Sequence, residues 1–280
     1  MRRELVAQTV STVRAQFLGL ENYREADVVA FVQRMLPLLR AGQQTMAQLV
    51  ALYLASLATA APVAAEQGIV IPPPPIPLDE VTDIREGVTG EEAYRRPFVT
   101  IYTELRTSGN MTEGVRKAAI RLDEMVEMDL QQSHSAAQAA GMARLDPRVR
   151  PQYWRRVLQG EESCALCVLA STQRYRREDL NPVHPGCDCL VRPIFPGDPD
   201  LTAEDEAELI GLAHRAAAEL TGEEPDYSGR STDYRAIRTN ITASHGEHPA
   251  PLLVRPLDRF DGPDAIPGDA PHRTSATDRR

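Results

Sequence analysis

Large aromatic side chains are scarce in this 280-residue chain, at 5% of the total, which argues against a large β-sandwich. Cations are also in the minority, because 31 Lys and Arg stand against 40 Asp and Glu, for a formal net charge of −9. Phosphate contacts need clustered cations, so this balance disfavours tight duplex binding by the whole chain. The length allows one or two compact domains with tails.

Long apolar runs are missing as well. The N-terminal sequence MRRELVAQTV is followed by neither the apolar run nor the cleavage site of a secretory signal, so export is not expected. The longest uncharged segment, residues 41–65, is strongly apolar over only about half of the roughly 20 residues that span a bilayer. We therefore expect it to form a helix that is buried or faces another subunit, and we expect no membrane partner.

Helical periodicity dominates the first half of the chain. Residues 4–60 predict two or three helices, with a turn near GLENY and a helix end at Gly42. The proline run IPPPPIPLDE, residues 71–80, can sustain neither a helix nor a sheet ladder and predicts an extended spacer. This spacer is interpreted as a linker, with a docking peptide for a partner as the alternative. Beyond it, Pro97 should break a helix that resumes through Leu105.

The longest predicted helix begins after Asn110, which should form a capping box with Glu113, and extends to about Leu145. His134 stands between two serines in this helix. Neighbouring helical positions do not face each other. We therefore expect a solvated surface histidine rather than a Ser/His catalytic pair.

These patterns predict a mainly α protein with a small α+β module that carries the cysteines. Trp154, the only tryptophan, should pack beneath this module or against the long helix. Thr202 should cap a later helix. The expected division is an N-terminal helical region (1–65), a Pro-rich linker (66–82), a helical region (83–150), the Cys/His module (151–196), a helix (197–222) and a partly disordered C-terminal extension (223–280).

All four cysteines lie in one stretch, ESCALCVLASTQRYRREDLNPVHPGCDCLV, residues 162–191. The pattern is C-x2-C followed by H-x2-C-x-C, so two turns of the chain present five donors: Cys164, Cys167, His184, Cys187 and Cys189. Zinc takes four sulfur or nitrogen ligands in a tetrahedron, and closely spaced cysteine pairs supply them in knuckles. We predict a structural zinc site in which one of the five donors is not a ligand.

Three rival interpretations of the cysteines differ from a structural zinc. A reduced, metal-free cluster stays open, and so do disulfides, although Cys187 and Cys189 are too close to bridge each other without strain. A catalytic zinc keeps an open position beside an acid or base, as in the deaminase pattern H-x-E…P-C-x-x-C. Here C-x2-C comes first, and Pro185 and Gly186 follow His184, so a closed structural site is favoured.

The segment YWRRVLQGEESCALCVLASTQRYRREDLNPVHPGCDCLVRPI, residues 153–194, resembles the central motif of the MuF-like minor head proteins of tailed bacteriophages. In that family an aromatic-Arg stretch precedes C-x2-C, and an H-x2-C-x-C turn follows further along. The sequence ITASHGEHPAPLLVRPLDRFDGP, residues 241–263, also resembles the tails of versions from actinobacterial phages. After Cys167 this chain has VLASTQRYRRED where the family often has a small DG turn.

The resemblance implies a low-copy virion component that acts in head morphogenesis at the portal vertex. Its partners would be the portal protein and other capsid or scaffold components. It would assemble in the host cytoplasm and reside in the head interior or at the portal vertex, packaged with the DNA. Self-association through the N-terminal helices and weak contact with packaged DNA stay open, and the zinc would stabilise a module rather than perform chemistry.

The sequence leaves two alternatives to this structural role open. Similar phage genes are sometimes labelled capsid maturation proteases, which would act on scaffold or major capsid protein. The chain has no G-x-S-x-G motif and no placed Ser/His/Asp set, so a non-enzymatic role is favoured and no catalytic residue is assigned. The basic segment RYRRED, residues 174–179, supports the second alternative, a zinc-stabilised nucleic-acid-binding protein, against the acidic balance of the chain.

Replacement of a predicted ligand tests the zinc site. Cys164→Ser and Cys187→Ser should each lower the stability of the module sharply, because metal affinity is folding free energy in such knuckles. Elemental analysis measures the zinc content of the purified variants, and thermal unfolding measures their stability. Unaltered zinc content in both variants would contradict the prediction.

Overall fold

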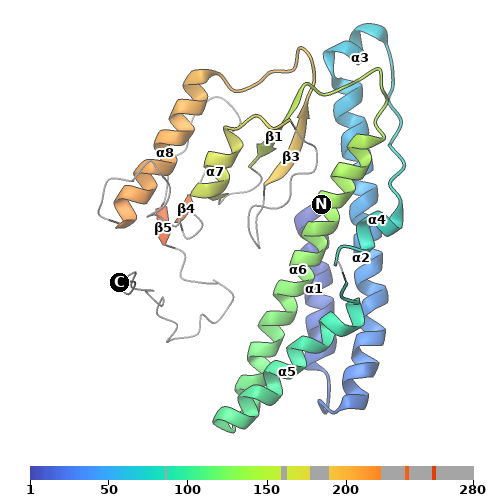
Figure 1. Cartoon of the computed structure of the whole chain (residues 1–280), viewed down its shortest axis with the longest axis vertical. Coiled ribbons are helices and arrows are strands. Elements are labelled where there is room, and N and C mark those ends of the chain that lie inside the picture. Colours follow the sequence, from blue (N-terminus) through green and yellow to red (C-terminus); the bar gives the residue numbers. More distant parts are fainter. Residues whose placement is uncertain (86, 159–162, 177–188, 222–236, 240–253, 257–280) are drawn as a thin grey trace, which may run out of the picture.

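The computed structural model describes residues 1–85, 87–158, 163–176, 189–221, 237–239 and 254–256. As predicted, the protein is mainly helical. An elongated bundle of helices forms the long axis of the molecule, and a smaller mixed part lies beside one half of the bundle (Figure 1). The bundle contains α1 (Arg2–Leu18), α2 (Glu25–Ala60), α3 (Pro62–Gln67), α4 (Leu78–Thr82), α5 (Gly90–Ser108) and α6 (Met111–Ala143).

Helix α6 begins where the capping pattern predicts it. The Asn110 side chain accepts a hydrogen bond from the backbone N–H of Glu113 at 3.1 Å, which satisfies one of the unpaired N–H groups of the first turn. Leu122, Val126 and Leu130 then bury one face of α6 completely. This face is the one that helical spacing predicts.

Helices from both sides of the proline run share one hydrophobic core. α1, α2 and α5 all pack on α6, and their buried side chains form a single cluster. At its centre Phe17, Phe31 and Phe98 meet edge to face, with ring centroids 5.3 to 5.7 Å apart. Aromatic rings favour this arrangement because a positive ring edge meets a negative ring face.

The expected helix end at Gly42 is wrong. α2 continues through Pro37 and Gly42 to Ala60. A Cβ atom at Gly42 would lie 3.2 Å from the Leu130 side chain and 3.3 Å from the Thr9 hydroxyl. The missing side chain therefore lets α1, α2 and α6 approach closely, and it does not stop the helix.

The expected break at Pro97 is also wrong, because α5 runs without interruption from Gly90 to Ser108. A proline inside a helix costs roughly 3 kcal/mol, since it removes one hydrogen bond and crowds the preceding turn. Tyr94, Phe98 and Ile101 are fully buried around it, and each such side chain contributes about 1.5 to 3 kcal/mol. Burial of this face outweighs the local cost.

The proline run is extended, as expected, but it packs on the bundle. Ile71 is buried, and its N–H donates to the Thr59 hydroxyl of α2 at 2.9 Å. Pro74 and Ile76 lie against α6, within 3.5 Å of the position that a Cβ atom on Gly141 would take. We call residues 69–77 the proline strap. Within the described residues, none of the helices has both the length and the hydropathy that crossing a membrane requires.

The smaller part combines short strands with two helices. β1 (Tyr153–Val157) pairs antiparallel with β3 (Leu190–Ile194), while β2 (Ser163–Cys164), β4 (Ile237–Thr239) and β5 (Val254–Pro256) form a second sheet. α7 (Ala165–Ser171) follows β2 directly and packs on α8 (Ala203–Thr221) through small side chains such as Val168, Ala213 and Ala216. The predicted cap of α8 is confirmed, because the Thr202 hydroxyl accepts from the N–H of Asp205 at 3.1 Å.

The expectation of a solvated histidine at position 134 is wrong. His134 is 6% exposed, because α1, α2, α4 and α5 all pack on α6 and cover more than one of its faces. This burial, with a smaller contribution from the positive charge of Arg2, lowers the pKa of His134 to about 3. The imidazole is therefore neutral in the folded protein at neutral pH.

His134 should make the bundle sensitive to acid. Between the ordinary pKa of 6.5 and the folded pKa of about 3, the unfolded chain binds a proton that the folded chain does not. The stability that depends on a neutral His134 is therefore fully present above pH 6.5 and is lost as the pH falls. At pH 4 the free energy of unfolding should be lower by about 3 kcal/mol. Urea unfolding of the wild type and His134→Gln at pH 7 and pH 4 measures it. The variant should lose less stability across this interval, and an equal loss would contradict the assignment.

Candidate functional site

The structure describes three of the five predicted metal ligands. Cys164 is the last residue of β2, and Cys167 lies in the first turn of α7 with 3% of its surface exposed. Cys189 is half-buried and comes directly before β3. The C-x2-C pair therefore lies at a strand-to-helix junction, where we expected a tight turn alone. His184 and Cys187 lie outside the described residues.

Cys167 and Cys189 pack against each other, together with Leu158 and Leu166. The pairing of β1 with β3 explains this contact, because Val157 lies opposite Leu190 and so brings the start of β3 to the end of β1. One cysteine from each of the two cysteine-bearing segments is thereby placed in the same cluster. The convergence of these segments was predicted from spacing alone.

Arg156 lies beside this cysteine contact. It is 8% exposed, and its Nη1 donates a hydrogen bond to the Cys189 Sγ at 3.4 Å. Its guanidinium also lies over the ring of Tyr175, 5.6 Å from the centroid. Since Arg156 pairs with Val191 in the ladder, Cys189 is its diagonal neighbour on the adjacent strand.

The chemistry of these donors fits zinc as far as they are described. Zinc binds thiolates at about 2.3 Å, and the side chains of Cys167 and Cys189 pack against each other. Across the part of the chain that the structure describes, no group of three or more His, Cys, Asp or Glu is placed to hold a metal ion. The zinc site therefore stays a prediction that rests on two placed thiols and on the sequence pattern.

Two contacts dock the paired strands β1 and β3 on the bundle. The side-chain amide of Gln138, on α6, donates to the carbonyl of Val191 at 2.6 Å and accepts from its N–H at 3.4 Å, as a neighbouring strand would. The indole N–H of Trp154 donates to the sulfur of Met142 at 3.0 Å. Trp154 thus packs against the long helix, which was one of its two expected positions.

Arg155, next to Arg156, serves a different contact. It is buried, forms ion pairs with Asp200 and Glu206, and donates to the Ser171 carbonyl of α7 at 3.2 Å. Arg174 pairs with Asp200 at 3.2 Å. These arginines bind acids of the same chain, so their charge is largely compensated and they do not form a free basic groove.

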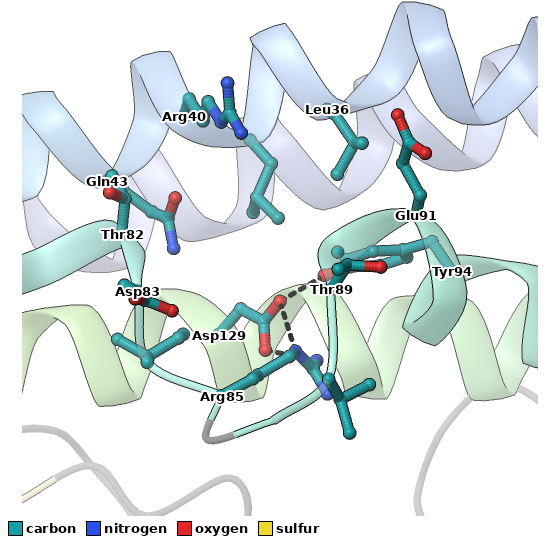
Figure 2. A pocket seen from close by; sticks show the side chains of 14 residues that line it. Leu36, Arg40, Gln43, Thr82, Asp83, Arg85, Thr89, Glu91, Tyr94 and Asp129 are labelled. Carbon is teal, nitrogen blue, oxygen red and sulfur yellow. Dashed lines mark hydrogen bonds and ion pairs between the residues drawn. The ribbon is translucent and has the colours of Figure 1, made fainter. Parts of the chain in front are cut away.

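Apart from the cysteines, the bundle holds a concave site that the sequence analysis did not predict (Figure 2). A cavity of about 410 Å³ opens between α2, α5, α6 and the segment that joins α4 to α5. Figure 2 shows Tyr94 and Arg85 directed at the carboxylate of Asp129, with Arg40 and Gln43 of α2 across the cavity. Its volume lies within the range of small-molecule pockets.

Asp129 is the buried centre of this site, with 2% of its surface exposed. The Tyr94 hydroxyl donates to Oδ2 at 2.7 Å, and Arg85 donates to both carboxylate oxygens, through Nε at 3.3 Å and through Nη2. Burial raises the pKa of the Asp129 carboxyl and that of the Tyr94 phenol. Both carboxylate oxygens of Asp129 accept hydrogen bonds, so this residue links α6 to α5 and to Arg85 and is not available as a base.

The sequence contains a signal for the burial of Asp129. Asp129 follows Val126 by three positions and precedes Leu130, so it falls on the apolar face of a predicted helix. An acid on such a face is almost never fully buried unless it is paired. This position alone would have indicated a buried partner, although it could not have identified Arg85.

Variants of the Asp129 site should lose stability in proportion to the buried charge that each leaves unpaired. Arg85→Leu removes the counter-charge of a buried carboxylate and should lower the free energy of unfolding by about 3 kcal/mol. Tyr94→Phe removes one hydrogen bond and should cost about 1 to 2 kcal/mol. The control Arg95→Leu breaks an exposed pair with Glu25 and should have little effect. Urea unfolding at pH 7 measures all three, and equal losses for Arg85→Leu and Arg95→Leu would refute the ranking.

Comparison with known proteins adds no relative to these observations. No protein-family model matches the chain, and neither a curated protein nor a solved structure is significantly similar to it. The likeness to MuF-like proteins therefore rests on the motif residues of the sequence alone.

Proposed function

We propose that this chain is a structural component of a tailed-phage head, a MuF-like minor head protein that joins the portal vertex during assembly. The observation that carries the proposal is the contact between Cys167 and Cys189. The aromatic-Arg stretch forms β1, the C-x2-C segment leads into α7, and the residues after C-x-C form β3. Separate parts of the motif thus belong to one small folded unit, as a stapled module requires.

A structural zinc is part of this proposal. Four of the five donors named above hold the ion, and the ion ties α7 to the start of β3. The fully buried side chains where α7 and α8 meet are alanines and one valine, and the leucines packed against them are only partly buried. A unit with so small a core gains much of its folding free energy from a metal.

The site in the bundle agrees with a structural role, because the buried Asp129 carboxylate is fully engaged by Tyr94 and Arg85. Arg155 and Arg174 are paired with acids, which weakens the nucleic-acid alternative. The partners in this proposal are the portal protein and other capsid or scaffold components, in the head interior or at the portal vertex.

Head assembly tests the role directly. Co-expression with the portal, scaffold and major capsid proteins of the same phage should place the chain in purified procapsids, at a low copy number relative to the major capsid protein, as measured by quantitative mass spectrometry. The major capsid protein should stay uncut when it is expressed with this chain alone. Procapsids that lack the chain, or cleavage of the capsid protein, would overturn the proposal.

A matched pair of variants links head assembly to the module. Cys167→Ser should reduce zinc content and incorporation into procapsids together. Thr103→Ala removes an exposed hydroxyl that bonds only within α5, and it should change neither. Gene order supplies an independent check, because the reading frame should follow a portal gene and precede scaffold and major capsid genes.

A further inference from the structure

We propose that the outer face of α1 and α2 binds a second copy of this chain, so that the protein forms an antiparallel two-fold dimer. The inference depends neither on the zinc nor on a role in a phage head. The sequence predicted that residues 41–65 form a helix that is buried or faces another subunit. In the structure α2 buries one side in the bundle and leaves the opposite side open.

The open side of α2 is uncharged over about five turns. Its exposed residues recur every three or four positions, and we call them the α2 face: Leu38, Ala41, Thr45, Gln48, Leu52 and Ser56. Leu52, near the middle, is 57% exposed. Residues 41–65 contain no Asp, Glu, Lys or Arg, whereas charged residues make up 25% of the whole chain. The solvent side of a helix normally carries charges, so their absence indicates a surface that a partner covers.

Helix α1 widens this surface and adds a groove to it. Residues 5–13 are also uncharged, and Gln8 and Thr12 are exposed. These two side chains line a groove of about 210 Å³ together with Ala41 and Thr45 of α2. A groove between side chains of packed helices accepts the ridge of side chains on another helix. The α2 helix of a second copy supplies such a ridge.

A second copy fits this surface better than other occupants do. A chain with a net charge of −9 repels its own copies over most of its surface, so contact between copies needs a patch without charge. A two-fold interface uses the same patch on both sides, and the α2 face meets this condition. Helices that lie on lipid carry Lys or Arg beside a broad apolar side, whereas only Leu38 and Leu52 are large and apolar here.

Charges beyond the two ends of the α2 face favour an antiparallel arrangement. Arg34 is exposed one helical turn before Leu38, and Glu66 is exposed in α3, just beyond the end of α2. An antiparallel copy brings the Arg34 end of one chain to the Glu66 end of the other, whereas a parallel copy would set like charges together. The two-fold axis then lies near residue 50. Gln48 of each copy consequently lies opposite Leu52 of the other.

The size of the surface predicts a weak dimer. Residues 38–60 span about 34 Å, and with a helix width of about 10 Å and the adjoining part of α1 each copy contributes roughly 500 Å². Stable interfaces bury about 800 Å² per partner. We therefore expect reversible association, with a dissociation constant of about 10 to 100 μM.

Sedimentation velocity of the full chain from about 1 to 300 μM measures this association. Leu52→Glu buries an unpaired charge in the dimer, and Gln48→Glu does so without a change in side-chain shape. Each should raise the dissociation constant at least about tenfold. The matched control Val99→Glu changes an apolar residue of α5 that is 60% exposed, and it should dimerise as the wild type does.

The changed positions are exposed in the single chain, so thermal unfolding at about 1 μM should be the same for all four proteins. If Leu52→Glu unfolds, Gln48→Glu decides the question. A wild type that stays monomeric to about 300 μM, or a folded Gln48→Glu that dimerises as tightly as the wild type, would overturn the inference.

A mixture of variants tests the antiparallel arrangement. Leu52→Glu in one copy and Gln48→Lys in the other place opposite charges against each other only if the two helices run in opposite directions. The mixed dimer should therefore form at least about fivefold more tightly than either variant does alone. A mixture that associates no better than the separate variants would overturn this arrangement.

Discussion

Burial of α6 holds the described structure together. α1, α2 and α5 complete their shared core only against this helix, and α4 packs on it from the segment between α3 and α5. Its C-terminal part then meets the smaller α+β part through Gln138 and Met142. A helix enclosed on several sides cannot shift without opening both the bundle core and the strand contact, so the two parts are mechanically coupled.

This coupling passes through side chains that are specific in geometry. Gln138 satisfies both backbone groups of Val191, and Val191 lies opposite Arg156 in the strand pair. Arg156 in turn donates to Cys189. The bundle is therefore connected to the cysteine contact through the Gln138–Val191 hydrogen bonds and the β1–β3 strand pair.

Some of these features could be predicted from the sequence and others could not. The Asn110 cap and the apolar face of α6 depend on neighbouring residues in the chain, and local patterns predicted both. Gly42 and Pro97 were misjudged, because their effect depends on which helices pack beside them. The burial of His134 has the same origin, since covering helices come from distant parts of the sequence.

The candidate site shows the same division. Cysteine spacing predicted that the two cysteine-bearing segments meet at a metal; the structure packs Cys189 against Cys167, and the metal site stays a prediction. The place of Arg156 depends on the register of two five-residue strands, which their own sequences specify weakly because neither has a clear alternation of polar and apolar residues. Consecutive arginines thus look equivalent in the sequence, yet one binds acids and the other binds sulfur.

The proline strap has a consequence for how this surface meets other polypeptides. Four successive prolines, residues 72–75, carry no amide hydrogens, so this extended surface segment cannot recruit a strand from another polypeptide. Prolines are also restricted before folding, which reduces the entropy lost when the strap settles on α2 and α6. The segment therefore covers the bundle at a small cost in conformational entropy and is a poor template for strand-mediated aggregation.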